Sequence, residues 1–162
     1  FLIGPVLVRS TNGGTVAGPG AGDTILRSIT LIDLAGKPRP LSEWQDRVLV
    51  CNFWATWCAP CREEIPMLIS TREKYRQTGL EIVGIAIDNV SKVAEFSASL
   101  KISYPILLAE ADGLDLMRKL GNGSGGLPYT VIADRQGALV YRKLGVMKQA
   151  DLDRILGPLV RN

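Results

Sequence analysis

The sequence predicts an α/β fold in which a central sheet with parallel strand pairs is covered by helices on both faces. Two apolar runs, 47–54 and 80–87, are nearly uninterrupted, which is typical of strands buried on both faces of a sheet. Segments with helical spacing of apolar residues alternate with strand-like segments along the chain. The 162 residues, of which 46% are hydrophobic, suffice for one domain with a buried core.

The first 22 residues differ in composition from the rest of the chain. Residues 1–8 are apolar and precede Arg9, but a membrane-spanning helix needs about 20 residues. We interpret this segment either as the end of a signal sequence or membrane anchor, or as a strand or loop packed on the domain. Residues 11–22 contain five glycines, which predicts a flexible linker. The folded domain is therefore expected over residues 23–162.

The first half of the domain is expected to begin with short elements and to continue with a long buried strand and helix. In chain order, we predict a strand at 28–33 that residues 35–38 turn back, a helical turn at 41–44, a strand at 47–54 and a helix at 59–77. Gly79 should end this helix, and Pro66 should interrupt and kink it because proline lacks an amide hydrogen.

The second half repeats the alternation of strands and helices. In chain order, we predict a strand at 80–87, a helix at 90–100, a strand at 105–109, a helix at 112–120, a glycine-rich loop at 121–126, strands at 129–133 and 138–143, and a helix at 149–160. Asp112 is expected to cap its helix. Residues 134–137 should join the last two strands as a hairpin.

The composition excludes several kinds of protein. The net charge is only +3 and no dense Lys and Arg cluster is present, so nothing indicates a nucleic-acid partner. The absence of histidine excludes Cys–His and Ser–His nucleophilic sites and most zinc sites, so no metal site is expected. Covalent haem attachment is excluded because Arg62 follows Cys61 where that motif needs histidine. Three cysteines are too few for a disulfide scaffold.

The motif that carries chemistry is Cys58-Ala59-Pro60-Cys61, at the junction of the strand 47–54 and the next helix. The unpaired N–H groups and positive end of a helix start favour a thiolate at Cys58. A thiolate attacks a disulfide, and Cys61 lies within reach to resolve the mixed disulfide that forms. Pro60 is tolerated in a first helical turn, and Trp57 offers an apolar platform beside the reactive sulfur. The motif predicts dithiol–disulfide exchange without a cofactor, because the two sulfurs carry both electrons.

The stretch Asn-Phe-Trp-Ala-Thr-Trp-Cys-Ala-Pro-Cys-Arg-Glu-Glu-Ile-Pro, residues 52–66, resembles the thioredoxin superfamily and most closely its membrane-associated TlpA/ResA/CcmG branch. The resemblance covers about residues 25–160. It implies a thioredoxin fold, which is a central mixed sheet flanked by helices, here with an N-terminal β extension. Residues of about 89–105 resemble the helix-containing central insert of this branch.

The resemblance extends to a loop far from the cysteines in sequence. Residues 126–130, Gly-Leu-Pro-Tyr-Thr, resemble the family's cis-proline loop, which implies that Pro128 lies beside Cys58 and that the Leu127 backbone pairs with a substrate strand. Without the resemblance, an ordinary trans proline before a strand is the simpler interpretation. The residues expected to contact the substrate are Trp57, Ala59, Pro60 and Leu127.

Glu64 is the candidate acid of the site. It follows Cys61 by three residues, where this branch has an acidic residue, and a three-residue step places both side chains on one helix face. We expect it to exchange protons with Cys61. The alternative is that Glu63 and Glu64 only complement the helix dipole, which is our interpretation of Glu63.

One position departs from plain thioredoxin. The buried strand aspartate that assists proton transfer there is replaced by Asn52, and its lysine neighbour by Gly84. Because an amide cannot act as a general base, this role is expected to fall to Glu64. Cys51 is expected to be a core residue, since a buried free cysteine behaves as a small hydrophobe; a regulatory disulfide is the alternative.

Four functions remain open at this stage. The resemblance implies a reductant tethered outside the inner membrane, which takes electrons from a membrane thiol carrier and reduces client proteins such as apocytochrome c or copper-site assembly proteins. The same geometry serves an oxidant that introduces disulfides, because the redox potential decides the direction. A peroxidase is disfavoured by the motif around Cys58. A Cu(I)-binding module would use the thiolates of Cys58 and Cys61, but no Met- or His-rich tract supports it.

Overall fold

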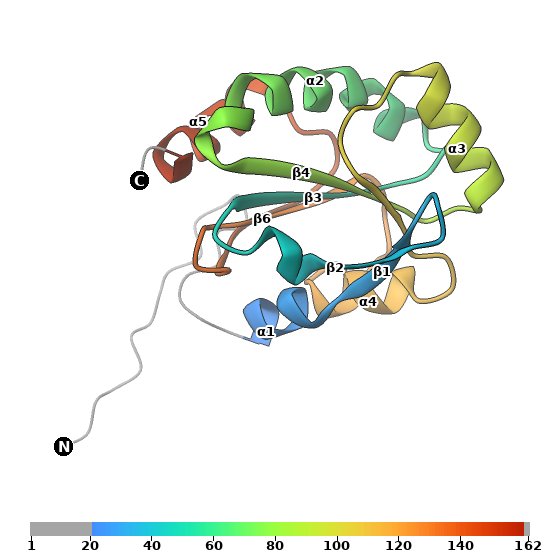
Figure 1. The fold of residues 1–162 in the computed structure, drawn as a ribbon, viewed down its shortest axis with the longest axis horizontal. Coiled ribbons are helices and arrows are strands. Elements are labelled where there is room, and N and C mark those ends of the chain that lie inside the picture. Colours follow the sequence, from blue (N-terminus) through green and yellow to red (C-terminus); the bar gives the residue numbers. More distant parts are fainter. Residues whose placement is uncertain (1–20, 161–162) are drawn as a thin grey trace.

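The strands form one mixed sheet, and helices alternate with them along the chain, as the apolar pattern predicts. The computed structural model describes residues 21–160, with side chains from 25 onward (Figure 1). Within this range one sheet has the strand order β2-β1-β5-β4-β3-β6-β7. The strands are β1 (Thr30–Asp33), β2 (Pro38–Pro40), β3 (Val48–Trp54), β4 (Leu80–Ala86), β5 (Ile106–Leu108), β6 (Tyr129–Ala133) and β7 (Leu139–Leu144).

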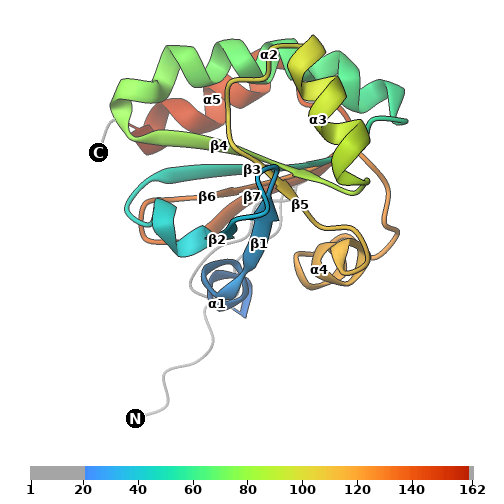
Figure 2. The ribbon, with the colours of Figure 1, turned by 45° about the vertical axis from the view of Figure 1, so that its right-hand side comes forward.

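Helices cover both faces of this sheet. They are α1 (Ala21–Ser28), α2 (Ala59–Tyr75), α3 (Val90–Ser99), α4 (Gly113–Lys119) and α5 (Gln149–Val160), with 3₁₀ turns η1 (Leu41–Trp44) and η2 (Arg76–Thr78). Helices α2, α3 and α5 lie on one face and α1 and α4 on the other, as Figures 1 and 2 show. None of the helices in the described residues is long and apolar enough to cross a membrane.

Strand direction brings several loops to one edge of the sheet. The pairs β3–β4 and β4–β5 are parallel, whereas β6 is antiparallel to both β3 and β7. The strands β3, β4, β5 and β7 therefore end at the same edge, which we name the carboxyl edge, and β6 begins there. Segments that are far apart in sequence meet at this edge.

The two central strands carry the core. Every residue of β3 and β4 is buried, as their unbroken apolar runs predict. On one face, Phe53 and Ile85 join a cluster that includes residues of α4, and on the other, Val50 and Ile82 pack with residues of α2 and α5. The sheet is thus a rigid support for whatever its carboxyl edge presents.

Two elements at the start of the domain differ from the prediction. Helix α1 was not predicted: it takes in the end of the predicted linker, then residues 23–27, which were given no element, and the first residue of the predicted strand, so the expected domain start at residue 23 falls inside a helix. Glycines at positions 20 and 22 conceal this helix in the sequence, but Leu26 is buried in the core and tertiary packing stabilises it. Part of the predicted turn 35–38 contributes to strand β2, which pairs with β1. The anchor prediction for residues 1–8 lies outside the described residues.

Two helix predictions also need correction. Asp112 precedes α4, but its side chain makes no capping hydrogen bond, so the predicted cap is wrong. Its backbone φ and ψ are helical rather than extended, which turns the carboxylate away from the capping geometry. The predicted interruption at Pro66 is absent: α2 is one helix with Pro66 inside it. Burial of Ile65 and Leu68 against the sheet offsets the missing hydrogen bond.

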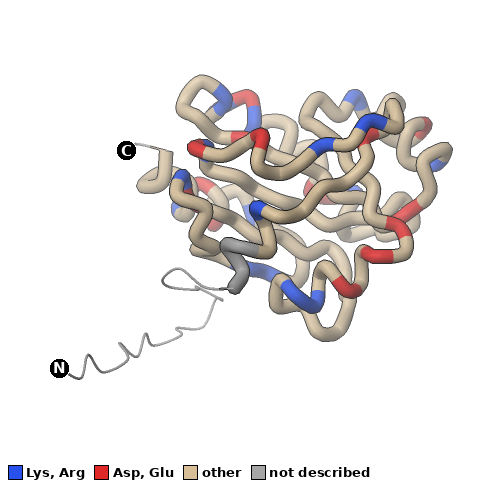
Figure 3. The backbone as a smooth tube through the Cα atoms, turned by 60° about the horizontal axis from the view of Figure 1, so that its bottom comes forward, with Lys and Arg blue, Asp and Glu red and all other residues tan. Residues whose placement is uncertain are grey.

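Both charge signs are spread over the surface of the domain. Figure 3 shows Lys and Arg positions on several sides of the described chain, interspersed with Asp and Glu. One ion pair is largely buried: Arg72 of α2 donates to Glu81 of β4 at 2.8 Å and joins the helix to the sheet. The most informative polar contacts lie instead near the carboxyl edge.

The free thiol of Cys51 yields a first prediction. Its side chain is fully buried in β3, and burial raises the pKa of this thiol to about 12. Substitution Cys51→Ser should reduce the free energy of unfolding by about 1–3 kcal/mol, because the hydroxyl would be buried without a partner. Urea denaturation measures this loss. The control Cys51→Ala should be less destabilised and should retain full disulfide exchange; loss of exchange in a folded Cys51→Ala protein would contradict a purely structural role.

Candidate active site

The reactive pair lies where β3 gives way to α2. Cys58 is the N-cap of the helix, and its sulfur accepts a hydrogen bond from the Cys61 backbone N–H at 3.4 Å. A turn holds Cys58 in place, since its own N–H donates to the Ala55 carbonyl at 3.2 Å. The sulfur therefore faces the unpaired amides and the positive end of α2, as the sequence predicts.

The two cysteines form a disulfide, with their α-carbons 5.3 Å apart. The two residues differ in solvent exposure: Cys58 is 6% exposed, whereas Cys61 is completely buried. Trp57 is 68% exposed, and Ala59 and Pro60 are exposed as well. A molecule that approaches Cys58 therefore contacts these three exposed residues, while Cys61 faces the protein interior.

The loop before β6 lies close to the cysteines. The Leu127–Pro128 peptide bond is cis, and the Pro128 carbonyl accepts a hydrogen bond from the Gly145 N–H at 2.8 Å. Leu127 is half-buried and packs against the cluster that contains Cys58 and Cys61. The fold therefore places Leu127 on the surface around the reactive pair, and Pro128 is buried beside it in the chain.

Glu64 lies in α2, about one helical turn beyond Cys61. Its side chain is 2% exposed. One carboxylate oxygen accepts from the Asn52 amide at 2.6 Å, and the other accepts from the Met147 backbone N–H at 2.9 Å. Burial raises the pKa of Glu64, and these hydrogen bonds, together with the charge of Lys143, offset only part of that effect. The carboxyl therefore keeps its proton to a higher pH than a free glutamate does.

Asn52 organises the surroundings of this carboxyl. Its Nδ2 donates to both Glu64 and Thr130, the latter at 3.1 Å, and so joins α2 to β6. Its neighbour on β4 is Gly84, as expected from the sequence. A Cβ at Gly84 would lie 3.0 Å from both the Trp54 indole nitrogen and the Tyr104 ring, so a lysine there would not fit without movement.

Three polar atoms around the Asn52–Gly84 pair are buried without a hydrogen-bond partner: Asn52 Oδ1, Trp54 Nε1 and the Tyr104 hydroxyl. Burial raises the pKa of Tyr104, and the Glu64 charge adds to this shift, which places the phenol within electrostatic range of the carboxyl. Unpaired donors and acceptors of this kind are costly in a core. They add polar atoms to the core around Asn52, whose amide donates to Glu64.

Asp88 fastens the turn that carries the reactive cysteine. Its carboxylate accepts hydrogen bonds from both the backbone N–H and the hydroxyl of Thr56, two residues before Cys58. It also accepts from the Asn89 N–H at 2.8 Å. Burial raises the pKa of Asp88, but these hydrogen bonds outweigh it and hold the pKa below the usual value. The carboxylate is therefore ionised and clamps the active-site turn to the end of β4.

Several of these contributors are not evident from the sequence. They are Thr130, Tyr104, the Met147 backbone and Asp88. Only Asp88 had a usable signal: it follows β4 as Thr56 follows β3, and the ends of adjacent parallel strands meet at one edge. The other three depend on which side chains the fold packs around Glu64, which no local pattern reveals.

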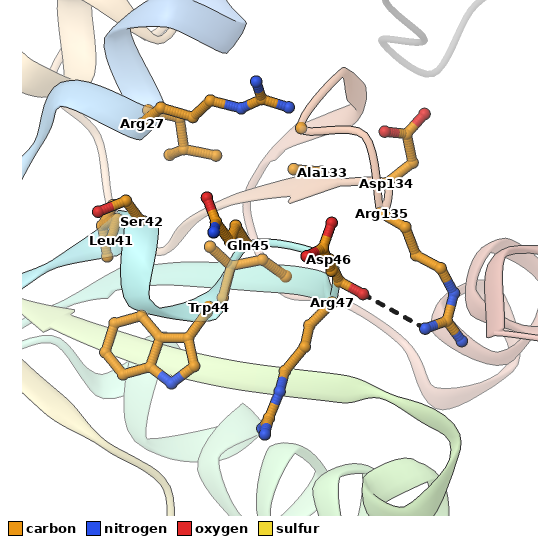
Figure 4. Close-up of a pocket in the computed structure, with 13 residues that line it drawn as sticks. Arg27, Leu41, Ser42, Trp44, Gln45, Asp46, Arg47, Ala133, Asp134 and Arg135 are labelled. Atoms are coloured by element: carbon orange, nitrogen blue, oxygen red, sulfur yellow. Dashed lines mark hydrogen bonds between the residues drawn. The ribbon is translucent and has the colours of Figure 1, made fainter.

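A pocket of about 210 Å³ lies at the opposite edge of the sheet, between α1, η1 and the β6–β7 hairpin (Figure 4). Its arginines hold the backbone together: Arg27 donates to the Gln136 carbonyl, and Arg135 to the Asp46 carbonyl at 3.4 Å. It lies at the edge of the sheet opposite Cys58, and the guanidinium groups of Arg27 and Arg135 are engaged in these structural contacts. Over residues 25–160, no three His, Cys, Asp or Glu side chains gather as metal ligands.

Comparison with known proteins agrees with this geometry. Residues 20–156 match the Redoxin family. The thiol-disulfide oxidoreductase ResA of Geobacillus kaustophilus is 30% identical over 127 residues, which cover 78% of this chain and 71% of that protein. ResA of Bacillus subtilis is 29% identical over 126 residues, with 76% and 67% covered.

Solved structures share the fold. A thioredoxin-family thiol:disulfide interchange protein from Chlorobium tepidum has a TM-score of 0.75 at 24% identity, covering 94% of this chain and 99% of the other. A secreted thiol-disulfide isomerase from Corynebacterium glutamicum has a TM-score of 0.77 at 25% identity, covering 85% and 86%. This chain therefore belongs to the Redoxin family, within the TlpA/ResA/CcmG-like branch of the thioredoxin superfamily, and is a thiol–disulfide oxidoreductase.

Proposed function

We propose that this protein reduces disulfides in client proteins outside the cytoplasm. The observation that carries the proposal is the asymmetry of the pair: Cys58 is 6% exposed and lies between exposed chain neighbours, whereas Cys61 is completely buried one helical turn before a carboxyl whose pKa is raised. A reductant needs a group that removes the Cys61 proton inside the protein, and Glu64 is suited to that task. The secreted thiol-disulfide isomerase from Corynebacterium glutamicum supports the location.

The reaction follows from the arrangement of the two sulfurs. The Cys58 thiolate attacks one sulfur of a client disulfide, forming a mixed disulfide and releasing the other client sulfur as a thiolate. Cys61 then gives its proton to Glu64 and attacks the Cys58 sulfur. The Cys58–Cys61 disulfide forms, the second client thiolate leaves, and two electrons have passed to the client. The Leu127 backbone and the surface of Trp57, Ala59 and Pro60 position the client during these steps, with Pro128 beside Cys58.

The cycle requires a donor that reduces the disulfide again. We assign this role to a membrane thiol carrier, with the protein held at the outer face of the inner membrane through residues 1–22. The clients we propose are proteins whose cysteines must be reduced before a group is inserted, such as apocytochrome c or copper-site assembly proteins.

The reduction potential of the Cys58–Cys61 pair tests the direction of the reaction. Equilibration in graded thiol–disulfide buffers, followed by the fluorescence of Trp57 and its neighbours, measures it. We expect about −250 mV or lower, on the thioredoxin side of the known range. A value near −120 mV, typical of strong oxidants, would overturn the reductant proposal and leave the exchange chemistry standing.

Substitution Glu64→Gln should slow release of the mixed disulfide by about 100-fold, within the usual range for loss of a general base. Formation of the mixed disulfide by Cys58 should be far less affected, so single-turnover kinetics with a disulfide-linked peptide separates the two steps. The matched control is Glu63→Gln, because Glu63 is the exposed neighbour. Release rates that stay at the wild-type level in Glu64→Gln from pH 6 to 9 would refute this role.

The raised pKa of Glu64 also predicts how stability depends on pH. Below the ordinary value of 4.5 the carboxyl is neutral in both the folded and the unfolded protein. As pH rises from there to the folded pKa, only the folded state keeps the proton, so the free energy of unfolding falls by up to about 1.4 kcal/mol per pH unit. Urea denaturation across this window should show that fall in the wild type but not in Glu64→Gln; parallel pH profiles would be the contrary result.

Substitution Asp88→Asn should loosen the turn before Cys58, because the NH2 group of asparagine would face either both Thr56 donors, which share one oxygen, or the Asn89 N–H. We expect attack by Cys58 on a small aromatic disulfide to slow by about 10-fold, with the melting temperature lowered by only a few degrees. Thr56→Val, which retains the backbone hydrogen bond, should have a smaller effect. An unchanged attack rate in Asp88→Asn would show that the clamp has no bearing on the chemistry.

A further inference from the structure

Exposed apolar side chains are concentrated near the reactive pair. Among residues 25–160, the large hydrophobic side chains that are exposed are Ile32, Trp57, Val90, Leu114 and Leu144. Four of these five follow or end strands at the carboxyl edge: Trp57 after β3, Val90 after β4, Leu114 after β5 and Leu144 in β7. Apolar surface grouped in this way marks an interaction site.

Beside this edge lies an open groove of about 680 Å³. It is formed by β1, the start of α3 and the loop from β5 to α4. Ile32 and Val90, which are 42% and 43% exposed, line it together with Leu31 and Leu108. The volume is in the range of sites that hold ligands, and the apolar lining is suited to one or more hydrophobic side chains.

The groove also carries negative charge. Three carboxylates and no basic side chain line it. Asp33 is engaged, because it accepts from the N–H groups of Ala35 and Lys37 at 2.9 Å. Glu110 and Asp112 are exposed and have no side-chain hydrogen bond or ion pair within residues 25–160. An occupant with a basic side chain would therefore complement this part of the groove.

The groove lies within reach of the active site. Val90 lies two residues after Asp88, which is bonded to Thr56, two residues before Cys58. On the other wall, Asp112 precedes Gly113, whose α-carbon packs against Ile87 at the end of β4. With about 3.8 Å between consecutive α-carbons, the α-carbons of Val90 and Cys58 lie no more than roughly 23 Å apart. About seven residues of extended chain span that distance.

We propose that this groove docks an extended segment of the client protein, with an apolar and a basic side chain within about seven residues of the cysteine that Cys58 attacks. The inference rests on the proposed function in taking the occupant to be a client. Apolar contact comes from Ile32 and Val90, and charge complementarity from Glu110 and Asp112. A client is thus selected by residues outside the immediate surroundings of its cysteine.

The test uses synthetic peptides that each hold one cysteine in a disulfide with a small aromatic thiol. One carries Leu-Lys, one Leu-Glu and one Ser-Lys, placed four to seven residues from the cysteine, and a further Leu-Lys peptide places the pair about fifteen residues away. For the reduced wild type, kcat/KM should be about 5- to 10-fold higher for the near Leu-Lys peptide than for the others. Equal values for all four peptides would overturn the proposal.

Two groove variants separate the contributions. Glu110→Gln/Asp112→Asn should lose the preference for Leu-Lys over Leu-Glu, and Val90→Ser the preference for Leu-Lys over Ser-Lys, both through a higher KM. Glu73→Gln/Glu95→Gln removes the same charge at exposed positions outside the groove and should behave as the wild type. The docking proposal would be refuted if the control lost the preference for the near Leu-Lys peptide, or if both groove variants kept it.

Reaction with the small aromatic disulfide alone distinguishes this inference from the proposed function. Its rate should be unchanged in the groove variants, and a loss equal to that seen with peptides would contradict docking in the groove. The measured reduction potential is independent of these results. An oxidising potential together with a peptide preference would overturn the reductant role and support the groove. A reducing potential without a peptide preference would support the reductant role and overturn the groove.

Discussion

The burial of Glu64 is the interaction on which the organisation of the active site depends. An isolated carboxyl in a core is costly, and here an amide from β3 and a backbone N–H after β7 compensate part of the cost. The same contacts fix α2, which carries both Cys61 and Glu64, relative to the sheet. The pKa of Glu64 is therefore raised by the same packing that positions the helix.

Replacement of an ionisable strand residue by Asn52 fits this arrangement. A second carboxylate within hydrogen-bond distance of Glu64 would repel it, whereas the amide donates to both Glu64 and Thr130. Gly84 completes the pattern, because the space above it is filled by Trp54 and Tyr104. One acid, supported by neutral neighbours, thus takes the place of a charged pair.

The carboxyl edge concentrates both chemistry and recognition. Asp88 ties the turn before Cys58 to β4, and the cis-proline loop approaches from the start of β6. Because the turns at this edge are anchored on fully buried strands, the exposed surface around Cys58 is held by a rigid support. Apolar groups such as Trp57 and Val90 can be exposed there because this surface is the part that meets a partner.

Much of the fold was predictable from the sequence. The buried runs of β3 and β4, the helices after them and the hairpin β6–β7 have strong local patterns, and the structure confirms them. Helix α1 and strand β2 were missed because Gly-rich and Pro-rich segments have weak local preferences and are stabilised by contacts with distant residues. The predicted Asp112 cap is wrong for the converse reason. Aspartate is a common capping residue, but the backbone conformation at this position does not allow its side chain to cap α4.

The sequence by itself determined the reactive pair, because a thiolate at a helix start needs only a strand, a turn and a helix in local order. It also indicated Glu64, since a three-residue helical step is a local relation. The tertiary structure alone decided that Glu64 is buried with a raised pKa, that Asp88 clamps Thr56, and that a groove lies within reach of the site. These depend on contacts between segments tens of residues apart, and hydrogen bonding and desolvation are properties of the packed surroundings, which a local sequence pattern does not contain.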